Sequence, residues 1–396
     1  MKPCFRRGLA AVQRFTPRAL PIAGLCLALG LAAANPALAG GDEWPFPSAG
    51  LKGEALERAR IENAPLWLNA RPLFTAAEDP AGKKGIVSLE PSLAGKAVLL
   101  HFWDYTNAHC LEMVPLLEAW QARYAKAGLV IVGVHAPQFP FTARSANVVE
   151  AVKRLGISYA VYLDSDFLLW RVFANQHWPR TILIAPGGSV IHDAIGAAQT
   201  VALEKSVRSV LRDKRGRRFS DAPLPPLPRE RDGAVCHAGT PDIFCGFERG
   251  RLGAPGYRKD GAPADYHIPS HAEVRQDDTI YLEGPWQARR QALVAAGGGP
   301  WEMRLRFRAV GVGLVMAPPP SERGARVRVT LDGKPVPPLF RGADLRVGPG
   351  GETTVTIGTP RLLRLVKQVP FAHHEIALFP ESPGTAFYVF YFEACE

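Results

Sequence analysis

Residues 64–212 alternate short apolar runs with amphipathic stretches. The runs at 98–103, 129–134 and 159–163 predict buried strands, and helical periodicity predicts helices over 109–125, 147–155, 167–173 and 201–211. Two more strands, 181–185 and 190–195, flank Pro186-Gly187-Gly188, which is a hairpin signal. The resulting order β-α-β-α-β-α-β-β-α predicts an α/β domain with a mixed sheet.

Residues 235–396 have a different pattern, that of an all-β domain. Met303, Leu305 and Phe307 alternate with arginines, as in a half-buried antiparallel strand. Asp332-Gly333 predicts a tight hairpin. A jelly-roll-like β-sandwich is therefore the expected architecture. The expected strands are 243–249, 279–283, 286–293, 302–310, 313–316, 326–331, 353–357, 361–369, 375–378 and 387–392.

The two domains are joined by residues 213–234, a segment rich in proline and charge that lacks apolar periodicity and is expected to be a linker. Residues 40–63 are expected to form an N-terminal arm. Residues 1–39 combine basic residues, an apolar run and Ala37-Leu38-Ala39, which is the pattern of a cleaved signal peptide. We therefore expect a periplasmic or secreted protein without stable membrane insertion.

The net charge of the chain does not indicate a particular class of binding partner. The net charge of +10 includes five basic residues in 1–39, so the remainder carries 10 − 5 = +5. That excess is scattered along the sequence, and its densest run, 212–218, adjoins the proline-rich linker. A nucleic-acid partner is not expected.

The chemistry centres on residues 102–110, Phe-Trp-Asp-Tyr-Thr-Asn-Ala-His-Cys, at a predicted strand-to-helix turn. In a C-x-x-C dithiol the first thiol lies at a helix N-terminus, which favours the thiolate, and attacks the substrate disulfide. The second thiol resolves the mixed disulfide. Here Asn107 stands in the attacking position and Cys110 in the resolving one, so ordinary dithiol exchange is not expected.

The order of elements and this turn resemble the thioredoxin fold of TlpA/ResA-like periplasmic oxidoreductases. Trp103 lies four residues before position 107, as in the W-x-x-x-C arrangement of that family, and Pro115 lies five residues after Cys110. Pro179 matches the cis-proline of the family. The resemblance implies a groove at Pro179 that pairs with a substrate chain, here a periplasmic protein thiol or peptide.

More narrowly, the chain resembles the C-terminal region of DipZ-type cytochrome-biogenesis proteins. The matching segments are 67–73 (W-L-N-A-R-P-L), 133–139 (G-V-H-A-P-Q-F, with His135) and 239–247 (G-T-P-D-I-F-C-G-F). The departures are Asn107 for cysteine, His109 for asparagine and Gln138 for glutamate. The resemblance implies that the β-domain is similar to a carbohydrate-binding module.

Two functions of different class follow. One is monothiol redox chemistry through Cys110, as a mixed disulfide, a sulfenic acid or a glutathione adduct. The other is a non-catalytic thioredoxin-fold scaffold that binds a periplasmic protein or glycan. His101 lies where thioredoxins carry a buried aspartate, so it is either a proton relay or a core histidine. His101, His109, Cys110 and His135 lack recognised metal spacing, and neither a metal nor a cofactor is expected.

The β-domain contributes the remaining candidates. In an oxidising compartment two of Cys236, Cys245 and Cys395 are expected to pair, either Cys245 with Cys395 or Cys236 with Cys245. Sugar stacking needs exposed rings. The candidate rings are Tyr257, Tyr266, Tyr281, Trp286 and Trp301, with core packing as the alternative.

Overall fold

The computed structural model describes residues 73–78, 84–87, 93, 95–186, 188–211, 216, 219, 222–322 and 324–395. All of these fall within one compact unit. The expected signal peptide 1–39, the arm 40–63 and most of the 67–73 motif lie outside the described residues, and the linker 213–234 is described only in part.

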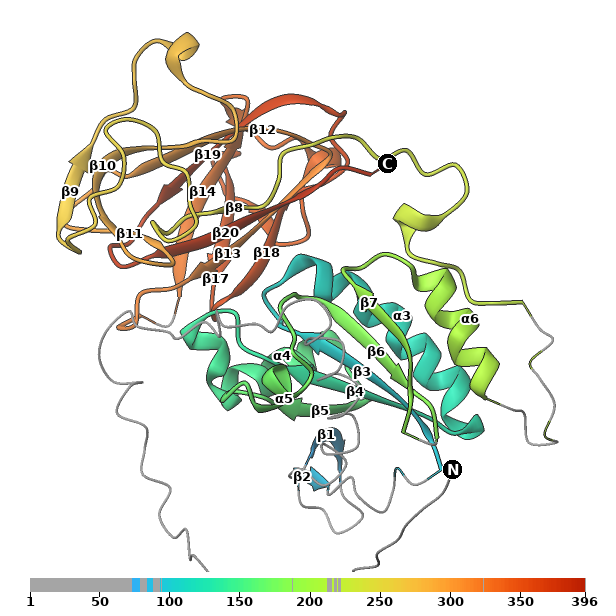
Figure 1. Ribbon diagram of the computed structural model, residues 1–396. Helices are drawn as coiled ribbons and strands as arrows, with labels where there is room; N and C mark the ends of the chain where they lie inside the picture. The colour runs from blue at the N-terminus through green and yellow to red at the C-terminus, as the bar shows by residue number, and fades with distance from the viewer. Residues whose placement is uncertain are drawn as a thin grey trace, which may run out of the picture. The chain divides into compact units, whose positions relative to one another are not determined.

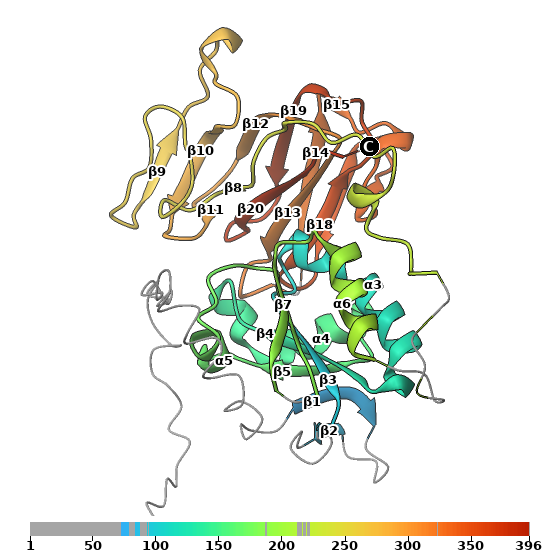
Figure 2. The same ribbon diagram turned by 45° about the vertical axis from the view of Figure 1, so that its right-hand side comes forward.

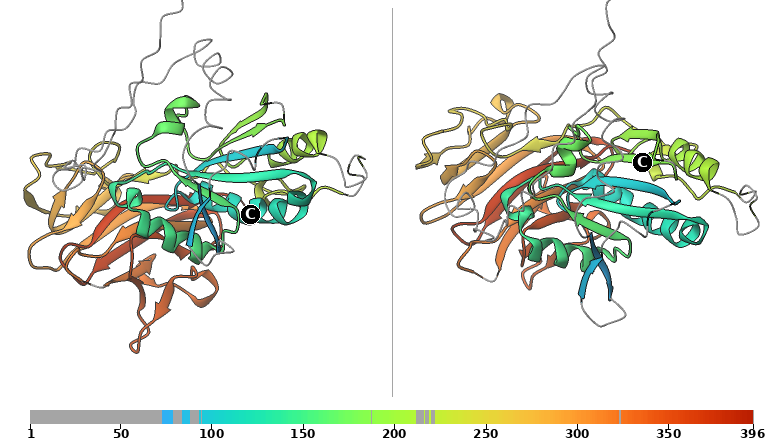
Figure 3. Two further views of the ribbon diagram at one scale, coloured as in Figure 1. Left: turned by 90° about the horizontal axis from the view of Figure 1, so that it is seen from below. Right: turned by 60° about the horizontal axis from the view of Figure 1, so that its bottom comes forward.

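The N-terminal domain is built on a mixed sheet of order β2-β1-β5-β4-β3-β6-β7 (Figure 1). At its centre β3 (Ala97–Trp103) runs parallel to β4 (Leu129–His135), which runs parallel to β5 (Ala160–Leu163). On the other side β6 (Arg180–Ile184) and β7 (Val190–Ile195) form the predicted hairpin. At the far edge the sheet is extended by β1 (Leu73–Glu78) and β2 (Lys84–Val87), two strands that the sequence pattern did not predict (Figure 3).

Helices cover both faces of this sheet (Figure 2). The odd positions of β3 pack in one apolar cluster with α3 (Ala108–Tyr124), α4 (Ser145–Leu155) and α6 (Thr200–Val210). The even positions pack with α5 (Leu168–Val172). Since successive side chains of a strand point to opposite faces, His101 lies on the α3 side. Every helix and strand predicted for 97–211 is present, with ends shifted by one or two residues.

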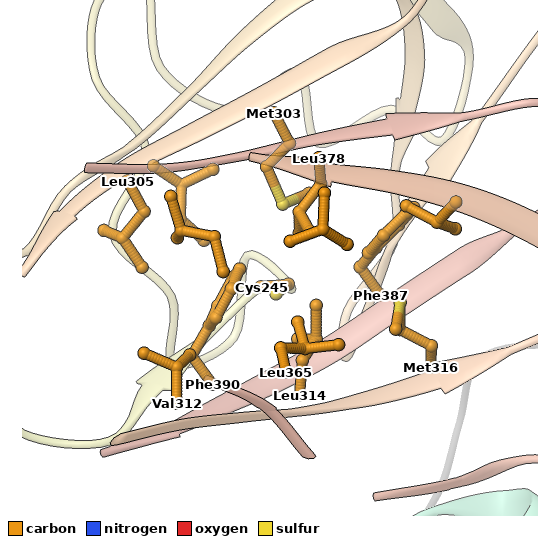
Figure 4. Packing of buried hydrophobic residues seen from close by; sticks show 14 of the residues in the cluster. Cys245, Met303, Leu305, Val312, Leu314, Met316, Leu365, Leu378, Phe387 and Phe390 are labelled. Atoms are coloured by element: carbon orange, nitrogen blue, oxygen red, sulfur yellow. The ribbon is translucent and has the colours of Figure 1, made fainter. Parts of the chain in front are cut away.

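The C-terminal domain is an antiparallel β-structure around one large apolar core. The facing strands contribute Met303, Leu314, Phe387 and Phe390, which interdigitate at the centre (Figure 4). Its strands are β8 (Ile243–Phe244), β9 (Pro263–Tyr266), β10 (Ile280–Ala288), β11 (Leu293–Ala295), β12 (Glu302–Ala309), β13 (Gly311–Ala317), β14 (Ala325–Leu331), β15 (Lys334–Pro335), β16 (Leu345–Val347), β17 (Thr353–Ile357), β18 (Arg361–Val366), β19 (Ala372–Pro380) and β20 (Ala386–Glu393).

Two expectations about these strands were wrong, and three short strands were missed. The segments 279–283 and 286–293 were expected to be separate strands, yet β10 runs through Gly284 and Pro285. Its first half pairs with β12 and its second half with β9 and β11, so the glycine and proline mark a change of partner. The strand expected over 243–249 is only two residues long, and β9, β15 and β16 were not predicted.

Both disulfide pairings expected from the sequence are also wrong. Cys236 is bonded to Cys395, and Cys245 is a free, fully buried thiol in the β-domain core. The backbone register gives the reason, because the Cys245 N–H donates to Tyr388 C=O, seven residues before Cys395 on the same ladder. Seven residues of extended strand span roughly 23 Å, far beyond the reach of a disulfide.

Candidate functional site

Asn107 acts as the N-cap of α3. Its backbone is extended, with φ −85° and ψ 117°, and its side-chain Oδ1 accepts a hydrogen bond from the Cys110 N–H at 3.2 Å. Asparagine is among the residues preferred at this position, because its oxygen satisfies a donor of the first helical turn. Asn107 therefore stabilises the start of the helix, and its carboxamide has no atom that can form a sulfur adduct.

The Asn107 carboxamide is also tied to the β-domain. Its Nδ2 donates to Gln138 Oε1 at 3.2 Å, and Gln138 Nε2 donates to the Tyr391 hydroxyl of β20 at 3.3 Å. The three residues are 7%, 2% and 3% exposed. Gln138, which the sequence marked as a departure from the DipZ pattern, is thus the link between the active-site turn and the C-terminal domain.

His109 makes a second polar contact to the β-domain. Its Nε2 lies 3.2 Å from Asp242 Oδ2, and its ring meets that of Tyr391 edge-on at 5.8 Å. The hydrogen bond to Asp242 is the main reason that the pKa of His109 is raised, and burial opposes it. The proximity of Glu112 raises this pKa further.

Apolar packing completes the cover over the turn. Four buried β-domain residues, Val315, Leu362, Val389 and Tyr391, belong to the same cluster as Trp103 and Cys110. The Tyr388 ring adds contacts to Phe139 and Phe141, with centroids at 5.0 and 4.9 Å. Consequently the whole turn from Asp104 to Ala108 is buried.

Cys110 lies beneath this cover. It is fully buried and unpaired, and burial raises the pKa of its thiol well above the usual range. Since the thiolate is the reactive form, both the burial of this sulfur and the raised pKa of its thiol oppose reaction.

His101 is fully buried on the same side of the sheet. Burial lowers its pKa to about 3, and its Nδ1 lies 3.4 Å from the Thr181 hydroxyl. The imidazole is therefore neutral near pH 7 and lies against the Thr181 hydroxyl of β6.

Asp104 is a buried carboxylate that the sequence analysis did not single out. It accepts hydrogen bonds from the Thr106 and Gln138 N–H groups, each at 2.7 Å. His135 Nε2 lies 3.7 Å from it, and burial lowers the pKa of His135. The aspartate fixes both Gln138 and the turn. An Asp two residues before a Thr in a strand-to-helix turn was the available signal, since such carboxylates cap nearby N–H groups.

The Trp178–Pro179 peptide bond is cis in the structure. Pro179 is buried, and Trp178 Nε1 donates to Ala136 C=O at 3.0 Å. The following residue, Arg180, is 1% exposed and forms a two-pronged ion pair with Asp193 at 2.8 and 2.7 Å. These contacts fix the segment that precedes β6.

The described residues provide no other obvious reactive centre. No group of three or more His, Cys, Asp or Glu side chains suited to a metal ion occurs among them. Within the same residues, no helix has the length and hydropathy needed to cross a membrane. Tyr266, Tyr281, Trp286 and Trp301 are buried, and Tyr257 is partly buried with its hydroxyl bonded to Cys245 C=O, so these five do not form an exposed stacking surface.

Part of the chain matches a known protein family. Residues 240–392 match the family model described as "Thioredoxin like C-terminal domain". Protein DipZ of Mycobacterium tuberculosis is 30% identical over 246 residues, which is 62% of this chain and 34% of DipZ. The chain thus spans about a third of the length of that relative.

Two smaller proteins are also similar to part of this chain. Thiol-disulfide oxidoreductase YkuV of Bacillus subtilis is 26% identical over 141 residues, 36% of this chain and 95% of YkuV. The crystal structure of StoA from the same species superposes with a TM-score of 0.27 at 18% identity, covering 35% of this chain and 98% of StoA.

Proposed function

We propose that this chain is an exported, non-catalytic binding protein that does not exchange disulfides. It carries a thioredoxin-like C-terminal domain and is related to DipZ and to thiol-disulfide oxidoreductases. Its β-domain, with a jelly-roll-like topology, occupies the face over the former redox site. The protein acts as a thioredoxin-fold scaffold for a ligand or protein outside the cytoplasm.

One observation carries the proposal. Asn107, in the attacking position, is hydrogen-bonded through Gln138 to Tyr391 of the β-domain, while Cys110 is fully buried beneath it. A catalytic disulfide exchange needs an exposed, low-pKa sulfur in this turn. Here the attacking position has no sulfur, and the thiol that is present, Cys110, is buried and has a raised pKa.

Export is supported by the leader pattern of residues 1–39 and by the disulfide between Cys236 and Cys395, since such bonds persist in oxidising compartments. The partner class stays as the sequence suggested it, a periplasmic protein or a glycan. The buried aromatic side chains of the β-domain give a glycan less support than a protein or small molecule.

The test is a disulfide-reduction assay on the chain beginning at Gly40 and on its Cys110→Ser variant. Equal, background rates for the two proteins are expected. Alkylation of the isolated proteins with and without a low-molecular-weight disulfide provides the control for slow adduct formation. A wild-type rate clearly above that of Cys110→Ser would instead establish monothiol chemistry and remove the proposal.

A further inference from the structure

A cavity of about 590 Å³ lies between the active-site helix and the C-terminal end of the chain. One wall is α3, from His109 to Ala119. The second is the proline-rich segment 224–231, and the third is formed by Arg364 of β18 with residues 392–395. Its volume is that of typical sites for small organic ligands, which are about 300–1,000 Å³.

The walls of the cavity are mostly apolar. Leu116 and Ala119 of α3 face the cavity together with Phe392 of β20 and the stretch Leu224-Pro225-Pro226-Leu227-Pro228. Prolines expose rigid apolar rings and no N–H donors. Such a lining suits a hydrocarbon or aromatic body and offers few partners to a polyhydroxylated ligand such as a sugar.

Of the three arginines that line the cavity, one has no carboxylate partner among the described residues. Arg229 is paired with Glu112, and Arg364 Nη1 is paired with Glu393 Oε1 at 2.7 Å. Arg231 forms no ion pair within the described part of the chain, and its Nε donates only a 3.4 Å hydrogen bond to Pro226 C=O. The guanidinium of Arg231 is therefore available to an anionic group.

We propose that this cavity binds a small amphipathic organic anion, with its apolar body against Phe392 and the prolines and its carboxylate or sulfonate at Arg231. The assignment rests on the proposed function in that it names the ligand class of the non-catalytic protein. The Cys236–Cys395 disulfide holds the cavity together, because Cys236 lies five residues after the 224–231 segment and is bonded to Cys395 of the C-terminal wall.

The experiment uses two matched fluorescent probes with the chain beginning at Gly40. The first, 8-anilinonaphthalene-1-sulfonate, carries an apolar body and one anionic group, and the second, N-phenyl-1-naphthylamine, has the same body without the sulfonate. Fluorescence titration gives a Kd for each. Tighter binding of the anionic probe at low salt is expected, because the unpaired Arg231 charge is near the surface and is screened by ions.

Two variants locate the binding. Arg231→Gln should weaken the sulfonate probe about tenfold and leave the uncharged probe nearly unchanged, since it removes one charge-assisted contact. Ala119→Trp should weaken both probes by at least about tenfold by filling the cavity. Arg171→Gln and Ala202→Trp, at exposed helix positions away from the cavity, serve as matched controls and should bind as wild type does.

The assignment is overturned if the sulfonate probe does not bind. It is also overturned if Arg231→Gln weakens that probe no more than Arg171→Gln does, or if Ala119→Trp weakens it no more than Ala202→Trp does. Circular dichroism of each variant establishes that it is folded. The disulfide-reduction assay measures thiol chemistry, and the fluorescence titration measures ligand binding independently of it. Saturable binding combined with Cys110-dependent disulfide reduction would remove the proposed function and keep the cavity. If neither probe binds and no disulfide is reduced, the cavity assignment is removed and the proposed non-catalytic function is kept.

Discussion

Gln138 Nε2 and the Tyr391 hydroxyl, 253 residues apart in sequence, lie 3.3 Å from each other over the start of α3. Gln138 also accepts a hydrogen bond from Asn107, so one carboxamide joins the turn at 104–108 to β20. In a catalytic thioredoxin domain this turn must meet a substrate disulfide. Here the β-domain fills that place.

The first prediction concerns the Tyr391 hydroxyl. Tyr391→Phe should lower the free energy of unfolding by about 1 kcal/mol, because it leaves the buried Nε2 of Gln138 without the acceptor that the Tyr391 hydroxyl provides. Urea denaturation followed by fluorescence measures this change. Tyr159→Phe is the matched control, since the buried Tyr159 hydroxyl has no hydrogen-bond partner among the described residues. A loss for Tyr391→Phe no larger than that for Tyr159→Phe would contradict a linking role.

The second prediction concerns thiol reactivity. The free cysteines of the described chain, Cys110 and Cys245, are both buried with raised thiol pKa values. In the native protein each should react with a maleimide roughly 1,000-fold more slowly than in urea, because labelling requires opening that costs several kcal/mol. Peptide mass spectrometry after timed labelling assigns the two sites. Fast native labelling of Cys110 with slow labelling of Cys245 would show that the cover opens readily.

The third prediction concerns pH. The pKa of His109 is raised in the folded protein, chiefly by its hydrogen bond to Asp242. The stability that this adds is fully present below the unfolded pKa of about 6.5 and is lost as pH rises through the higher folded value. Both side chains are about 30% exposed, so the effect is about 0.5 kcal/mol.

Asp242→Asn isolates this contribution. The difference in free energy of unfolding between wild type and variant should be larger at pH 5.5 than at pH 8.5. The nearby charges of Glu112 and Arg229 remain in both proteins and largely cancel in the comparison. A difference that grows toward high pH would have the wrong sign for a protonated His109.

The sequence predicts the local structure of the N-terminal domain well, because a buried strand and an amphipathic helix each leave a periodic pattern. The turn chemistry of Asp332-Gly333 is equally local: both residues have positive φ, and Leu331 pairs with Lys334. The edge strands β9, β15 and β16 have only two to four residues each, too few to show a period.

The site depends on contacts that no local pattern records. The sequence drew attention to Asn107, His109, Cys110 and Gln138, and the structure places them together. It did not indicate that Tyr391 and Asp242 would cover them, because both lie in another domain. Asp242 stands in the DipZ-like segment 239–247, but nothing in that pattern records a contact with the turn. The sequence left His101 as either a proton relay or a core histidine. Its full burial, which lowers its pKa, could be recognised only from the packing around it.

The last prediction concerns the Cys236–Cys395 disulfide, which closes a loop with a sequence separation of 159 residues. A bond across so long a loop restricts the unfolded chain strongly, and its removal in the Cys236→Ser, Cys395→Ser variant should cost about 2–4 kcal/mol in the free energy of unfolding. Reductant should destabilise wild type by a similar amount and leave the double variant unchanged, which separates the bond from other effects of substitution. Since Cys395 also borders the cavity, the same variant should bind the sulfonate probe more weakly. If stability falls while probe affinity is retained, the disulfide stabilises the fold without shaping the cavity, and the walls must be held by the β-domain alone.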